Sequence, residues 1–147
     1  MENQNEVSIL IVEDDDGHAR LIAKNLKRAG ISNHITRVEN GREALDFLFS
    51  EGAFVGQERP SPLLVLLDLN MPVMDGYQVL ERMKADPRTH KVPVVVLTTT
   101  DDAREVTRCY ELGCSVYITK PVEYESFASA IQQLGLFMSI VTVPNGG

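Results

Sequence analysis

The chain has no tryptophan, two cysteines and no apolar run near the ~20 residues that a membrane-spanning helix needs. Cys109 and Cys114 match neither a Cys-x-x-Cys redox pair nor a zinc site, which is typical of small buried thiols in a reducing compartment. The polar segment 1–6 has no features of an export signal. We therefore expect a cytoplasmic protein that does not insert into membranes.

Positive charge is also scarce, with 14 Lys and Arg against 21 Asp and Glu and a net charge of −7. This balance repels nucleic-acid phosphates and anionic lipid surfaces, so direct binding to either is not expected. The three histidines, His18, His34 and His90, are scattered along the chain and do not suggest a transition-metal site.

Apolar residues make up 44% and charged residues 24% of the 147 residues, values that suit one globular domain. No composition change marks a domain boundary. We expect a single domain with a core over about residues 7–134 and a C-terminal extension over about residues 135–147.

Segments rich in Val, Ile and Leu alternate with segments of helical spacing. The predicted strands are Val7–Val12, His34–Val38, Leu63–Leu67, Val94–Leu97 and Ser115–Ile118. The predicted helices contain Ala19–Ala29, Leu45–Phe49, Tyr77–Met83 and Ala103–Tyr110, and a last one begins near Glu123. Strands that are nearly all apolar are covered on both faces. The pattern predicts an α/β fold, a doubly wound five-stranded parallel sheet with five helices.

Polar residues follow four of these strands, at the edge where open parallel sheets bind ligands. They are Glu13–Asp16, Asp68–Asn70, Thr98–Thr100 and Thr119–Lys120. We expect their side chains to gather at one rim of the sheet.

The acidic run has two interpretations. Asp15 and Asp16 fit the cap and first turn of the following helix, where carboxylates meet free backbone amides. Glu13 and Asp14 lie where a buried strand emerges, close to the expected position of Asp68. Two carboxylates about 4 Å apart repel by roughly 4 kcal/mol at an effective dielectric near 20, so this group needs cations. Mg²⁺ suits it, because that ion prefers oxygen ligands.

Lys120 could supply the second cation, or it could be an ordinary solvated lysine at a turn. Thr98 could simply end a strand as a β-branched residue, or its hydroxyl could donate a hydrogen bond to an anion at the rim. Asp68 follows five apolar residues, so its carboxylate should stand on a rigid base and could act as a nucleophile.

The residues Asp68, Asn70, Pro72, Asp75 and Gly76 form an Asp-x-Asn-x-Pro-x-x-Asp-Gly turn. Together with the acidic pair, the threonine and the Lys-Pro dipeptide, this turn resembles the bacterial response-regulator receiver domain. The resemblance covers nearly the whole chain.

The resemblance implies that Asp68 is a phosphoacceptor and that Glu13 and Asp14 hold Mg²⁺, which Asn70 also binds through its backbone carbonyl. Glu13 stands where aspartate is more frequent in the family.

The resemblance also implies which residues respond to phosphorylation. It implies that Thr98 senses the phosphoryl group, that Lys120 pairs with it, and that the rotation of Tyr117 is coupled to Thr98. The chain would then be a switch in a two-component system, phosphorylated by a sensor histidine kinase, rather than an enzyme with turnover.

Three segments narrow the resemblance to the single-domain regulators that pair with phytochrome histidine kinases: the long connection 51–62, Lys91–Thr99 and Phe137–Pro144. In the last helix and tail, two apolar sets keep helical spacing. One is Phe127, Ala130, Ile131, Leu134, Met138 and Val141, and the other is Leu136, Phe137 and Ile140. The second set predicts a homodimer, or else a tail that folds on its own domain.

Two other functions remain open. One is a small Mg²⁺-dependent phosphohydrolase with an aspartyl nucleophile, and the other is a receiver-like binding module that is never phosphorylated. In the receiver hypothesis the output is contact with a downstream protein or onward transfer to a phosphotransfer protein.

Overall fold

The structure, a computed structural model, describes residues 7–28, 34–71, 73–99, 102–120 and 123–133. Its centre is a five-stranded, all-parallel sheet with the order β2-β1-β3-β4-β5. The strands are β1 (Ser8–Val12), β2 (Ile35–Val38), β3 (Leu63–Asp68), β4 (Val94–Thr98) and β5 (Val116–Thr119). The predicted strands are confirmed to within one residue at each end.

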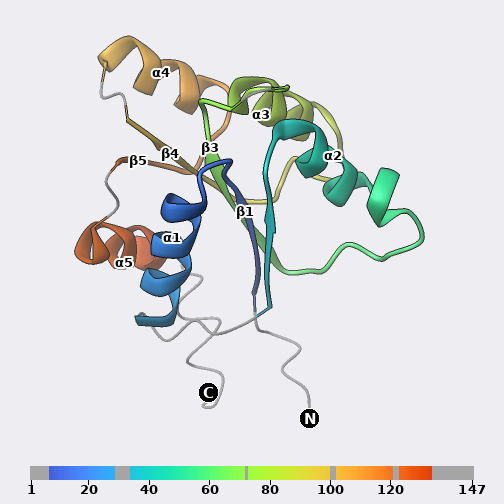
Figure 1. Cartoon of the computed structure of the whole chain (residues 1–147). Coiled ribbons are helices and arrows are strands. Elements are labelled where there is room, and N and C mark those ends of the chain that lie inside the picture. Colours follow the sequence, from blue (N-terminus) through green and yellow to red (C-terminus); the bar gives the residue numbers. More distant parts are fainter. Residues whose placement is uncertain (1–6, 29–33, 72, 100–101, 121–122, 134–147) are drawn as a thin grey trace, which may run out of the picture.

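Helices cover both faces of the sheet, with α1 and α5 on one face and α2, α3 and α4 on the other (Figure 1). They are α1 (Asp16–Arg28), α2 (Gly41–Phe49), α3 (Gly76–Ala85), α4 (Ala103–Glu111) and α5 (Tyr124–Gln133). The doubly wound fold expected from the sequence is therefore confirmed. None of the helices in the described ranges is long and apolar enough to span a membrane.

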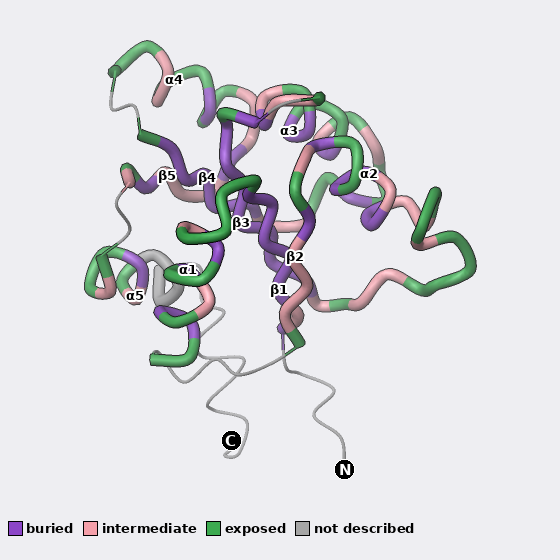
Figure 2. Tube along the Cα trace, viewed as in Figure 1, coloured by how far each residue is buried: buried purple, intermediate pink, exposed green. Residues whose placement is uncertain are grey.

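The sheet separates two apolar cores. Alternate residues of β3 enter opposite cores, Leu64 and Leu66 on the α1/α5 side and Val65 and Leu67 on the other, and all six residues of this strand are buried (Figure 2). The α1/α5 core is closed by Phe127, which has no exposed surface. This burial on both faces explains why the central strands lack alternating polar residues.

Helix α3 begins directly after the loop that follows β3. Asp75 caps it, accepting a hydrogen bond from the Gln78 amide at 3.0 Å, while the Gln78 side chain accepts one from the Asp75 amide. A Cβ on Gly76 would lie 2.5 Å from the Asp68 carbonyl oxygen and 2.7 Å from the Leu69 Cα. Only glycine allows the helix to start this close to the end of β3.

Two details differ from the sequence pattern. In α4 the buried residue is Cys109, whereas Tyr110, which carried the predicted spacing, is 48% exposed. This helix contacts β5 at the end of the sheet, so only a narrow stripe of it is covered.

The connection 51–62 contains a short 3-10 helix, η1 (Gly52–Phe54), whose Phe54 ring packs edge-on against Phe47 with 5.2 Å between the ring centroids. The predicted extension 135–147 lies outside the described residues.

Candidate functional site

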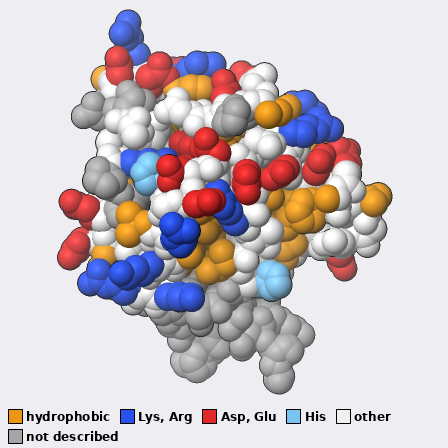
Figure 3. Space-filling model, viewed as in Figure 1, with side chains coloured by type: hydrophobic (Ala, Val, Ile, Leu, Met, Phe, Trp, Pro, Cys, Tyr) orange, Lys and Arg blue, Asp and Glu red, His pale blue; other side chains and the backbone are white. Residues whose placement is uncertain are grey.

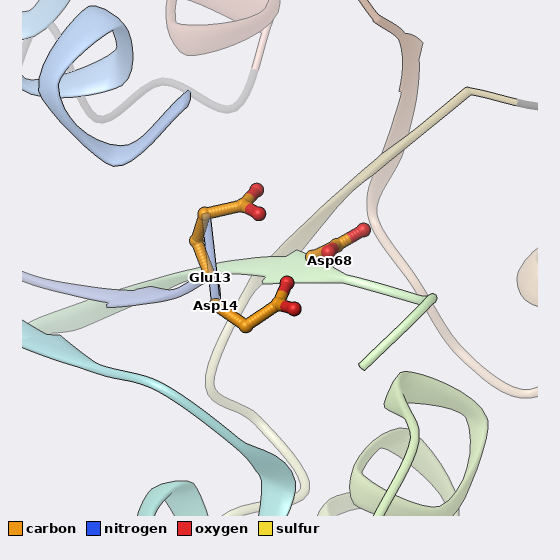
Figure 4. A group of neighbouring side chains, drawn as sticks. All are labelled: Glu13, Asp14 and Asp68. Carbon is orange, nitrogen blue, oxygen red and sulfur yellow. The ribbon is translucent and has the colours of Figure 1, made fainter. Parts of the chain in front are cut away.

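The carboxyl ends of β1 and β3 lie side by side at the centre of the sheet, where the winding direction reverses. Glu13 and Asp14 follow β1, and Asp68 is the last residue of β3. One carboxylate oxygen from each of these three residues lies within 4.8 Å of the others. Their carboxyl groups point into the same space (Figure 4). Glu13 and Asp68 are buried, at 1% and 3% exposure, whereas Asp14 is exposed.

Lys120 extends into this acidic group from the end of β5. Its Nζ lies 2.7 Å from Glu13 Oε1 and 3.4 Å from Asp68 Oδ1, and its side chain is 6% exposed. The Lys120 amide donates to the Thr98 carbonyl at 2.6 Å, which fixes the start of the loop. The alternative of a solvated surface lysine is therefore wrong, and the ammonium is a buried counter-ion.

The pKa of Asp68 is raised from 3.8 to about 6, mainly by burial and next by the charge of Glu13. Lys120 and the hydrogen bond from the Asn70 amide, 3.3 Å from Asp68 Oδ1, act in the opposite direction. The net shift is upward because one ammonium only partly offsets two buried carboxylates and the lost solvation.

This shift predicts a pH-dependent stability. Because the folded chain holds the Asp68 proton more tightly than the unfolded chain, wild type should lose stability relative to Asp68→Asn as pH rises from 3.8 to about 6. The difference in the free energy of unfolding should grow by about 3 kcal/mol across this window and stay constant above it. Urea denaturation of both proteins without divalent ions measures it. A difference that does not change with pH would contradict the raised pKa.

The side chain of Asn70 joins the ends of β3 and β4. Its Nδ2 donates to Thr98 Oγ1 at 3.3 Å, and Thr98 is fully buried. Tyr117 lies on β5 opposite Val96 of β4 and packs, partly buried, against the core on the α2/α3 side. The structure thus places Thr98 beside the acidic group, while Tyr117 stands one strand further along.

The rest of the acidic run forms the start of α1. Asp15 Oδ1 accepts a hydrogen bond from the His18 amide at 2.9 Å, which is the main cause of a lowered pKa at Asp15. The predicted capping role of Asp15 is confirmed. Asp16 Oδ1 instead lies 2.6 Å from a guanidinium nitrogen of Arg37. The imidazole of His18, in the first turn of α1, lies 3.4 Å from Lys120 Nζ.

Sequence reasoning did not identify Arg37 or His18 as part of this site. The only available signal for Arg37 was its place near the end of a predicted strand, since its contacts depend on the register between β1 and β2. His18 follows the acidic run by two residues, but its direction depends on how α1 begins.

The donors at the rim suit a hard divalent cation. Three carboxylates face one ammonium, so the group keeps net negative charge, and every donor is an oxygen. Both carboxylate oxygens of Glu13 already have protein partners. Oε1 contacts Lys120, and Oε2 accepts a hydrogen bond from the Asp15 backbone amide at 3.2 Å. Acidic side chains also gather across the upper half of the face in Figure 3, whereas basic side chains are more frequent at its lower left.

Comparison with known proteins agrees with this arrangement. Residues 9–132 match the family model of the response regulator receiver domain. The response regulator Rcp1 of Synechocystis sp. is 36% identical over 137 residues, which cover 92% of both chains. Its structure with Mn²⁺ bound superposes with a TM-score of 0.76.

Two further solved structures are similar over most of the chain. The bacteriophytochrome response regulator RtBRR is 39% identical with a TM-score of 0.81, covering 88% of this chain and 78% of its own. The phosphorylated cyanobacterial phytochrome response regulator RcpA is 33% identical with a TM-score of 0.75, covering 90% and 93%. The resemblance noted from the sequence is thus confirmed, and the chain belongs to the response regulator receiver domain family.

Proposed function

We propose that Asp68 is the phosphoacceptor of this receiver domain. The observation that carries the proposal is the contact of the Asp68 carboxylate with Lys120 at 3.4 Å, inside a group of three carboxylates at the ends of β1 and β3. A buried strand holds this nucleophile in place, and the ammonium offsets charge on the transferring oxygens.

In the proposed reaction, an Asp68 carboxylate oxygen attacks the phosphorus of a phosphohistidine in line with the departing imidazole. The oxygen–phosphorus bond forms as the phosphorus–nitrogen bond breaks, and the imidazole nitrogen takes up a proton. The product is an acyl phosphate, which water later hydrolyses to aspartate and inorganic phosphate. The side chains of the rim mainly position and neutralise the reacting groups.

We propose Mg²⁺ as the cofactor, held by the carboxylates of Glu13, Asp14 and Asp68 and by the backbone carbonyl of Asn70. When bound, this ion would neutralise phosphoryl oxygens that the carboxylates would otherwise repel. Support comes from the all-oxygen donor set and from the Mn²⁺-bound structure of the similar protein Rcp1.

The proposed switch begins at Thr98. Its hydroxyl accepts a hydrogen bond from Asn70 in this structure, and it could instead donate one to a phosphoryl oxygen on Asp68. A shift of Thr98 would alter packing between β4 and β5, where Tyr117 lies opposite Val96. The face of α4, β5 and α5 would then report the phosphorylated state to a partner.

The proposed partner is a sensor histidine kinase of the phytochrome type, supported by the similarity to RtBRR, RcpA and Rcp1. Such a donor would place the protein in the cytoplasm. We also propose a homodimer through the second apolar set, Leu136, Phe137 and Ile140. Its output would go to a downstream protein or phosphotransfer protein, without direct nucleic-acid or membrane binding.

Incubation of the wild-type chain with acetyl phosphate and Mg²⁺, followed by intact mass measurement, tests the proposal. We expect one phosphoryl group to be added, and none when EDTA is present. A chain that gains none would instead be a binding module. The absence of an enzyme function is part of the same proposal, so continuous hydrolysis of p-nitrophenyl phosphate would indicate a phosphohydrolase.

A further inference from the structure

One arginine from the neighbouring strand holds the loop that carries the acidic residues. Arg37 lies on β2 opposite Ile11 of β1. Its Nε and one terminal nitrogen donate to the Glu13 carbonyl oxygen at 3.0 and 2.8 Å, and its other terminal nitrogen lies 2.6 Å from Asp16 Oδ1. A single side chain therefore joins the end of β1 to the first residue of α1.

These contacts fix a peptide plane next to the site. The Glu13 carbonyl and the Asp14 amide belong to one planar unit, so two donors on that oxygen also fix the direction in which the chain enters Asp14. Asp14 is the exposed member of the acidic group, and no other described residue hydrogen-bonds to its side chain. Its carboxylate is therefore placed by the backbone.

We propose that Arg37 is a positioning residue for the divalent-cation site, acting on Asp14 through the Glu13–Asp14 peptide. The inference rests on the proposed function of the acidic group. It gives a new role to a residue that donates to none of the three carboxylates of that group. The planar fork of the guanidinium makes this possible, since lysine has no such paired donors.

The positive charge of Arg37 should weaken cation binding, whereas its positioning of Asp14 should strengthen it. A positive charge close to the site repels a divalent cation, so its removal should strengthen binding if charge alone matters. If positioning dominates, removal should weaken binding despite the more negative site. The sign of the change therefore distinguishes the two roles.

A titration of the full chain with Mn²⁺, monitored by electron paramagnetic resonance, shows whether each variant binds the ion more weakly or more tightly than wild type. We expect Arg37→Gln and Arg37→Lys each to bind Mn²⁺ roughly 10-fold more weakly than wild type, as is usual when a residue that orients a ligand is lost. Arg20→Gln is the matched control, because it removes an exposed positive charge from α1.

A second measurement separates positioning from a general structural role. The Mg²⁺ concentration for half-maximal phosphorylation by acetyl phosphate should rise by roughly the same 10-fold in Arg37→Lys, while the rate at saturating Mg²⁺ stays within about 3-fold of wild type. A merely structural residue would lower the saturated rate and the thermal midpoint together. That result would overturn the proposal.

The proposal is also overturned if Arg37→Gln binds Mn²⁺ as tightly as wild type or more tightly, or if wild type binds no divalent cation. If Arg37→Gln does not fold, Arg37→Lys decides the question, because it keeps the positive charge and lacks the paired donors. Failure of the proposed function is distinguishable. A wild-type chain that binds Mn²⁺ but never gains a phosphoryl group contradicts the phosphoacceptor role of Asp68, while the Mn²⁺ series still tests Arg37.

Discussion

Asp68→Asn is expected to gain no phosphoryl group from acetyl phosphate and Mg²⁺ under conditions in which wild type is fully modified. The amide keeps the shape of the side chain but lacks the anionic oxygen that attacks phosphorus. Loss of the nucleophile should lower the rate of uptake by at least about 100-fold, which corresponds to roughly 2.7 kcal/mol in the barrier. Intact mass measurement over time gives the rate for both proteins.

Asp86→Asn provides the control for this experiment. Asp86 ends α3 and pairs with Arg88 on a turn remote from the rim, so its amide variant should be modified at the wild-type rate. Uptake by Asp68→Asn at the wild-type rate would contradict the proposal. Asp14, the exposed carboxylate of the same group, would then be the next candidate for the modified residue.

Lys120→Met is expected to cause a large loss of stability in the absence of divalent ions. The substitution keeps an unbranched side chain one atom shorter, but it leaves Glu13 and Asp68, at 1% and 3% exposure, without their ammonium. Removing one partner of a buried ion pair costs about 3–5 kcal/mol. Urea denaturation at about pH 8 should therefore show a decrease of about 3 kcal/mol in the free energy of unfolding.

The loss should depend on pH and on Mg²⁺. Lys120 holds down a pKa of Asp68 that burial has raised, so without the ammonium this carboxyl takes up a proton at higher pH and the penalty shrinks on acidification. Mg²⁺ should restore part of the stability, because a ligand that binds only the folded chain favours it. The same loss at every pH and Mg²⁺ concentration would show that Lys120 is not the counter-ion.

Lys84→Met is the matched control. Lys84 is also partly buried, and desolvation lowers its pKa, but its ammonium donates to the backbone carbonyls of His90 and Val92 at 3.0 and 2.9 Å. Its removal leaves neutral acceptors behind. The destabilisation of this variant should therefore be unaffected by Mg²⁺.

The sequence was sufficient to predict the sheet and the location of the site, because both depend on local patterns. Strands buried on both faces appear as continuous apolar runs such as Leu63–Leu67, and residues that follow parallel strands meet at one edge whatever the details of packing. Glu13, Asp14, Asp68 and Lys120 could therefore be placed together before any coordinates were known.

Contacts that depend on register or on side-chain length could not be predicted. The sequence indicated Lys120 as a counter-ion, but not that its Nζ lies nearer to Glu13 than to Asp68. Arg37 reaches Glu13 only because it stands opposite Ile11, a register that periodicity does not give. Tyr110 kept helical spacing, yet its exposure depends on how much of the sheet α4 covers.

The fit of Gly76 against the Asp68 carbonyl has a mechanical consequence. With 2.5 Å between that oxygen and the position of a Cβ, and with the Gly76 amide bonded to the Leu69 carbonyl at 3.1 Å, β3 and α3 meet in a stiff joint. A stiff joint allows little relative motion, so the start of α3 and the end of β3 should behave as one rigid unit. Motion that starts at the Asp68 side chain should travel sideways across the sheet, through Asn70 into β4.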